Sequence, residues 1–153
     1  MKIDYADIDN ALDYFENKQF SDKSEKEIFS KFPEVMSYLT SNQFSVLSDD
    51  EYMILSFDIL ILLKALTDKN ETFHGITDEL IELNETKNWE ALENTGNIPF
   101  KEKVYLLFGK ANNDLAEFIL SGFDDEEDDV EISLPAQEII FITVKTIVDC
   151  FSG

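Results

Sequence analysis

The chain has 153 residues, with 33 aspartates and glutamates against 12 basic residues, which gives a formal charge of −21 and a pI near 4.1. This length favours one domain, and a hydrophobic content of 44% with 13 phenylalanines excludes a disordered chain. The charge excludes functions that need a basic surface, namely direct binding to nucleic acid or to an acidic lipid surface. All the basic residues are lysines, so arginine, which recognises phosphate best, is absent. Codon bias in an AT-rich genome is the alternative explanation for its absence.

The cysteine content and the hydropathy of the chain indicate where in the cell we expect the protein. Cys150 is the single cysteine, which excludes an intramolecular disulfide. The residues Met1–Asp7 carry acids where a signal peptide needs an apolar run. The longest apolar stretch, Tyr52–Leu66, has about 15 residues and contains Asp58 and Lys64, whereas a membrane helix needs about 20. We therefore expect a soluble, cytoplasmic protein that does not engage a membrane.

The first forty residues predict a series of short amphipathic helices. In the first segment, the apolar residues recur at the spacing of one helical face and are Ile8, Ala11, Leu12 and Phe15. The second segment, 24–42, contains Pro33. Because proline suits the first position of a helix and disrupts an interior one, we expect a new helix to begin there.

The strongest helix start is at Ser48, where Ser48-Asp49-Asp50-Glu51 has the S-x-x-E pattern of a capping box. The apolar residues that follow surround the helix axis, which is typical of a buried helix. The sequence therefore predicts a central helix over about 49–66, around which the others pack.

Two further helices are expected in the second half. Thr77 is a candidate N-cap, followed by acids in the favourable first turn. Pro99 begins a helix predicted to run to about Ser121 and to stop at Gly122. Gly109 lies away from the apolar stripe of that helix, so it either permits a second helix to approach or marks a kink.

The C-terminal segment Pro135–Phe151 is rich in β-branched residues, which favours a strand. Its large apolar residues nevertheless cluster within about 120° of helical arc, and Thr143 and Thr146 lie outside that arc. We therefore predict a helix. The resulting fold class is all-α, an irregular single-domain bundle of six or seven helices.

The sequence offers little for catalysis or for a metal. His74 is the only histidine, and Glu71–His74 matches the Glu-x-x-His pattern of di-metal bundles. That site needs a second such pair, so we interpret His74 as a loop residue. Cys150 follows an apolar run and is interpreted as a small buried hydrophobe. The five glycines are isolated, which excludes a phosphate-binding loop. We expect no enzyme, no metal site and no cofactor.

The segment Asp78–Glu93 predicts an acidic helix face. Within about 140° of arc lie Asp78, Glu79, Glu82, Glu85, Glu90 and Glu93. Trp89 falls in the same arc, and a tryptophan ringed by carboxylates resembles the anchor of an interface with a basic partner. Alternatively, residues 84–88 break the helix and turn Trp89 into the core.

The segment 124–131 is the most acidic part of the chain, with seven acids in eight residues. Without it the charge is still −14, so the acidity belongs to the whole chain. The segment lacks the glycine and the spaced closing glutamate of an EF-hand. It is either a solvated loop that maintains solubility or an electrostatic lure for a cationic partner. The candidate partner-binding residues are Asp124, Asp125, Glu126, Glu127, Asp128, Asp129, Glu131, Glu82, Glu85, Trp89 and Glu93.

These features favour a non-enzymatic acidic binding protein that engages a basic protein. A concrete form is an immunity-like or antitoxin-like inhibitor of a cationic nuclease, or a mimic of the phosphate array of nucleic acid. The alternative is a structural or adaptor domain whose acidity serves solubility alone.

Overall fold

The computed structural model describes residues 2–19, 21–69, 75–124 and 131–152. In these ranges the chain forms eight α-helices and two short 3-10 helices, without a strand, which confirms the predicted all-α class. The α-helices are α1 (Tyr5–Asn17), α2 (Asp22–Phe29), α3 (Pro33–Leu39), α4 (Asp49–Lys69), α5 (Asp78–Asn94), α6 (Phe100–Phe108), α7 (Asn113–Phe123) and α8 (Leu134–Ser152). The 3-10 helices are η1 (Asn42–Val46) and η2 (Lys110–Asn112).

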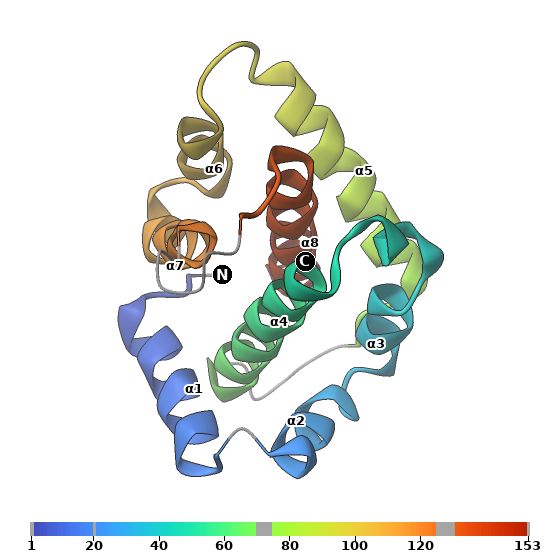
Figure 1. Ribbon diagram of the computed structural model, residues 1–153, viewed down its shortest axis with the longest axis vertical. Helices are drawn as coiled ribbons and strands as arrows, with labels where there is room; N and C mark the ends of the chain where they lie inside the picture. Colours follow the sequence, from blue (N-terminus) through green and yellow to red (C-terminus); the bar gives the residue numbers. More distant parts are fainter. Residues whose placement is uncertain (1, 20, 70–74, 125–130, 153) are drawn as a thin grey trace.

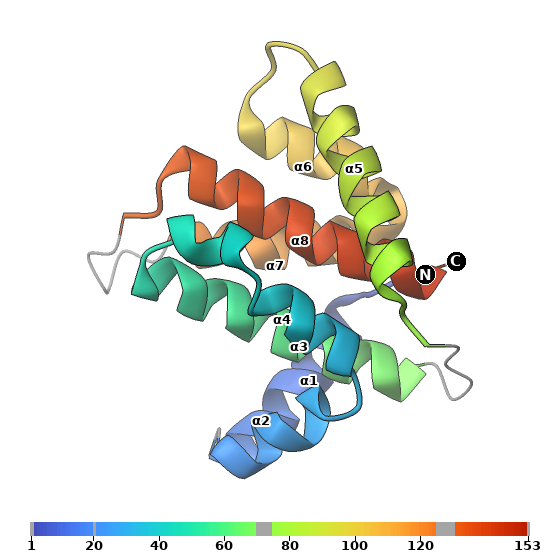
Figure 2. The same ribbon diagram turned by 90° about the vertical axis from the view of Figure 1, so that its right-hand side faces the viewer.

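Two long helices occupy the middle of the molecule. Figure 1 shows α4 and α8 enclosed by a ring of the other six α-helices, and Figure 2 shows that α4 and α8 run side by side in the same direction. Helix α4 also packs against α1 and α2, while α8 packs against α5. The predicted central helix, 49–66, thus lies within α4, and α8 shares its place in the core. No helix of the described residues is long and apolar enough to cross a membrane.

The capping box that begins α4 forms as predicted. The backbone N–H of Ser48 donates to Glu51 Oε1 at 2.9 Å, and the N–H of Glu51 donates to Ser48 Oγ at 3.2 Å. Glu51 is buried, and its Oε2 accepts bonds of 3.3 Å from the backbone N–H and the hydroxyl of Ser133. These hydrogen bonds, first those from Ser48, lower the pKa of Glu51. The same carboxylate therefore caps α4 and ties it to the start of α8.

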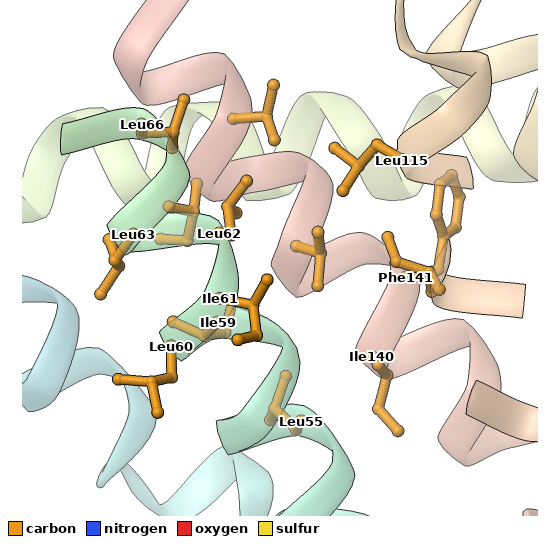
Figure 3. Close-up of a cluster of buried hydrophobic side chains, with 14 of the residues drawn as sticks. Leu55, Ile59, Leu60, Ile61, Leu62, Leu63, Leu66, Leu115, Ile140 and Phe141 are labelled. Carbon is orange, nitrogen blue, oxygen red and sulfur yellow. The ribbon is translucent and has the colours of Figure 1, made fainter. Parts of the chain in front are cut away.

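The core is built from apolar side chains of several helices. Figure 3 shows side chains of α4, among them Leu55, Ile61 and Leu62, gathered with Leu115 of α7 and with Ile140 and Phe141 of α8. All of these side chains are buried. Because apolar residues surround the axis of α4, its sequence does not show which neighbouring helix each side faces.

Helix α8 confirms the helical interpretation of the C-terminal segment. Thr143 and Thr146, which lie outside the apolar arc, are buried as well. The hydroxyl of Thr143 donates to the backbone carbonyl of Ile139 at 2.7 Å, and Thr146 Oγ1 accepts from Asn88 Nδ2 at 3.2 Å. These bonds remove the cost of burying the two hydroxyls.

The single helix expected from Pro99 to Ser121 is two helices, α6 and α7, which raises the number of helices above the predicted six or seven. The break is at Gly109, whose φ of 75° and ψ of 175° end α6. Gly122 does not stop the second helix, because it lies inside α7, which ends at Phe123. Of the two roles considered for Gly109, the structure shows the kink, since the helix breaks at this residue.

We expect Gly109→Ala and Gly122→Ala to change stability in opposite directions. Among the described residues, a Cβ added at either position has no side chain from elsewhere in the fold within 4 Å, so neither substitution alters the packing of side chains. Residue 109 has a backbone conformation open essentially to glycine alone, and alanine there costs about 1–3 kcal/mol. Residue 122 is helical, where alanine is favoured by up to about 1 kcal/mol. Urea unfolding of both variants measures the change in the free energy of unfolding. An equal change for the two variants would contradict the break at Gly109.

The N-terminal predictions are also confirmed. Asp4 and Asp7 form a reciprocal capping box at the start of α1, and Ile8, Ala11 and Phe15 are buried. Leu12, the remaining member of the predicted stripe, is half-buried and packs against the core. Pro33 occupies the first position of α3, as predicted.

Candidate functional site

A cleft lies between the α3–η1 segment and the first half of α5. Its volume is about 430 Å³, and it is lined by Ser37, Tyr38, Ser41, Gln43, Asp78, Ile81, Glu82 and Glu85. We name it the acidic cleft, because its described lining contains three carboxylates and no lysine. Ile81 is buried and supplies an apolar wall. The remaining groups are hydroxyls and an amide, which can accept hydrogen bonds from a cationic donor.

The acidic cleft has one carboxylate in a fixed position. Glu85 is half-buried on α5. Its Oε2 accepts a short hydrogen bond from the Tyr38 hydroxyl and one of 3.3 Å from Gln43 Nε2. Both bonds use the same oxygen, Oε2, and Oε1 can accept a hydrogen bond from a further donor. Burial, followed by the bond to Glu85 and its charge, raises the pKa of Tyr38 well above its ordinary value. Tyr38 therefore remains a hydrogen-bond donor at physiological pH.

Helix α5 is held to α8 by polar contacts. Asn88 is buried, and its Nδ2 donates to Thr146 Oγ1 at 3.2 Å and to Asp149 Oδ2 at 3.1 Å. One turn earlier, Asn84 Nδ2 donates to Cys150 Sγ at 3.5 Å. These contacts fix the rotation of α5 about its axis, so Glu82 and Glu85 are turned to the acidic cleft rather than to α8.

Within the described ranges, no lysine forms an ion pair with a carboxylate of the acidic cleft. Among the described residues, the pairs of lysine and acid within 4 Å are Lys64–Asp68, Lys69–Asp7 and Lys145–Asp149. None of these pairs belongs to the cleft. Three like charges in a concave surface produce a negative potential that attracts cations.

Four of the predicted partner-binding residues lie on α5. Glu82 and Glu93 are exposed, and Glu85 and Trp89 are half-buried. The structure brings Glu82 and Glu85 together in the acidic cleft, and Trp89 and Glu93 are not part of its lining. The alternative in which residues 84–88 break the helix is wrong, since α5 runs without interruption to Asn94. Trp89 packs part of its ring against the core from within that helix.

The other predicted residues belong to the acidic run. Asp125, Glu126, Glu127, Asp128 and Asp129 lie outside the described residues. Asp124 and Glu131, at the two ends of the run, are exposed. Asp124 lines a second cleft of about 400 Å³ that also contains Lys101 and Glu117. Its mixed charges distinguish that cleft from the acidic cleft.

Cys150 and His74 are the residues considered in the sequence for catalysis or metal binding. Cys150 is a buried free cysteine, and burial raises the pKa of its thiol, so the thiol remains protonated and a poor nucleophile. His74 lies outside the described residues, as do Glu71, Thr72 and Phe73. Within the described ranges, no group of three or more histidine, cysteine, aspartate and glutamate side chains is arranged to hold a metal ion.

The sequence did not reveal Tyr38, Gln43 or the two serines as parts of the site. Tyr38 and Gln43 lie 47 and 42 residues from Glu85 along the chain, and no local pattern encodes a contact at that separation. Comparison with known proteins gave no match to a family model, to a curated protein or to a solved structure.

Proposed function

We propose that this protein is a non-enzymatic binding protein that engages a basic protein partner, with the acidic cleft as its principal contact. The observation that supports this most directly is the juxtaposition of Asp78, Glu82 and Glu85 in a concave surface without a lysine. The net charge of −21 adds a long-range attraction for a basic partner and accelerates the encounter.

The lining of the acidic cleft suits a lysine side chain of the partner. Ile81 and the Tyr38 ring offer apolar surface to the methylene groups, and the carboxylates accept hydrogen bonds from the ammonium group. Because Tyr38 and Gln43 already hold Glu85, binding does not have to order that side chain. An inhibitor that covers the phosphate-binding lysines and arginines of a cationic nuclease is a concrete form of this function.

Salt dependence tests the proposal. We expect decalysine, used as a probe of a basic partner, to bind in a calorimetric titration. Raising the salt from about 50 to about 200 mM should weaken the binding by about tenfold or more, because screening shortens the reach of the field. An uncharged peptide of the same length serves as the control. Decalysine binding that is indifferent to salt would contradict the proposal.

A second candidate function, an adaptor domain, is favoured by exposed apolar residues on α4. Met53 is 68% exposed, and Phe57, one turn later on the same face, is 36% exposed. The Phe57 ring lies 6.4 Å from the Phe118 ring of α7, measured between centroids. A partner joined through such side chains would bind with little dependence on salt, which separates the two functions.

A further inference from the structure

Asp58 is a carboxylic acid in the middle of the core. It lies on α4 and is only 4% exposed. By helical geometry it shares one face of α4 with Leu55 and Leu62, both buried. Glu51, two turns earlier on the same face, bonds to Ser133 at the start of α8. This face of α4 is therefore turned toward α8, where a carboxyl is expected only if it is paired or neutral.

One oxygen of the Asp58 carboxyl lacks a hydrogen-bond partner among the described residues. This oxygen, Oδ2, is buried. An ionised carboxylate without donors in apolar surroundings is far more costly to bury than the neutral acid.

The charged groups on the neighbouring helices do not offset this cost. On the described helices around α4, the charged side chains that are at least half-buried are Asp7, Glu25, Glu34, Glu85, Lys103, Asp114, Glu138, Lys145 and Asp149. Asp7 pairs with Lys69, and Lys145 pairs with Asp149. Burial alone raises the pKa of Asp58 well above its ordinary value of 3.8.

We propose that Asp58 makes the core of this protein pH-sensitive: the folded protein keeps a proton on this carboxyl, and release of that proton to solvent favours the unfolded chain.

The direction of the effect follows from linkage. Below the ordinary pKa of an aspartate, the Asp58 carboxyl is protonated in both the folded and the unfolded chain. In that range the stability does not change with pH through this group. As the pH rises toward the higher pKa of the folded state, the unfolded chain ionises first, so the unfolding equilibrium constant increases. The contribution to stability is thus fully present at acidic pH and is lost as the pH rises through the folded-state pKa. The pKa of Glu51 is lowered, so the contribution of Glu51 to stability increases as the pH rises.

Asp58→Asn isolates this contribution, because asparagine has nearly the same shape and does not ionise. Urea unfolding of both proteins between about pH 4 and about pH 8 gives the ratio of their unfolding constants. We expect the wild-type constant to rise relative to the variant by up to tenfold for each pH unit, about 1.4 kcal/mol, and then to level off. The matched control is Asp13→Asn at an exposed position of α1, for which we expect a nearly flat ratio. A flat ratio for Asp58→Asn would overturn the proposal.

Infrared spectroscopy tests, in the wild-type protein itself, whether the folded chain keeps a protonated carboxyl. We expect the folded wild-type protein to retain a protonated-acid carbonyl band at about pH 7, where exposed carboxyls are ionised, and to lose that band when urea unfolds it. A folded protein without the band at that pH would overturn the proposal, whether or not Asp58→Asn folds.

Discussion

Phe141→Ala is expected to lower the free energy of unfolding by about 3–5 kcal/mol, the range for a buried phenylalanine reduced to alanine. Phe141 of α8 is fully buried. Its ring makes edge contacts with Phe108 at 5.3 Å and with Phe100 at 6.0 Å, both on α6. The substitution therefore removes apolar area and two aromatic pairs and leaves a cavity where α6 meets α8. Since small domains are stable by only about 5–15 kcal/mol, a large share of the variant is expected to unfold on mild heating.

Urea unfolding followed by circular dichroism measures this loss. The matched control is Leu106→Ala, which removes an apolar side chain that is 61% exposed on α6, the helix against which Phe141 packs. We expect the control to stay within about 0.5 kcal/mol of the wild type. A loss below about 1 kcal/mol for Phe141→Ala would contradict the packing of α6 against α8.

The double variant Glu82→Gln/Glu85→Gln should bind decalysine about tenfold more weakly than the wild type. Glutamine keeps the size of each side chain, and its carbonyl can still accept the hydrogen bond from Tyr38. The change thus removes two of the three charges of the acidic cleft with little effect on its shape. Two partly exposed charge contacts of up to about 1 kcal/mol each account for an effect of this size.

The control for this variant must change the net charge equally. Glu16→Gln/Glu27→Gln does so at exposed positions on α1 and α2, away from the acidic cleft. Titration calorimetry at low salt should give the control nearly the wild-type affinity. Equal weakening of the two double variants would show that decalysine responds to total charge rather than to the acidic cleft.

Much of the fold was predictable because its determinants are local. The capping box at Ser48, the proline at the start of α3 and the spacing of apolar residues each act within one or two helical turns. The break at Gly109 was only partly predictable, since an apolar stripe continues across it and a glycine inside a helix is tolerated. The burial of Asp58 was not predictable at all, since the sequence does not show which neighbours surround a helix that is apolar on all sides.

The candidate site was predictable to a smaller degree. The acidic arc of α5 pointed to Glu82 and Glu85, because helical periodicity alone places them on one face. The other wall of the acidic cleft comes from Tyr38 and Gln43, which tertiary packing brings to α5 from distant parts of the chain. Trp89 was ambiguous for a physical reason: an amphipathic side chain can bury part of its ring and expose the rest.

Affinity capture from a lysate of the organism that makes the protein shows whether the acidic cleft binds a basic partner. The baits are the wild type, Glu82→Gln/Glu85→Gln and the control Glu16→Gln/Glu27→Gln, each washed first at low and then at moderate salt. We expect the wild type and the control to retain one basic protein in stoichiometric amount at low salt and to release it at moderate salt, while the cleft variant retains little of it. A partner that stays bound through the salt wash, or that binds all three baits equally, would rule out electrostatic binding at the acidic cleft.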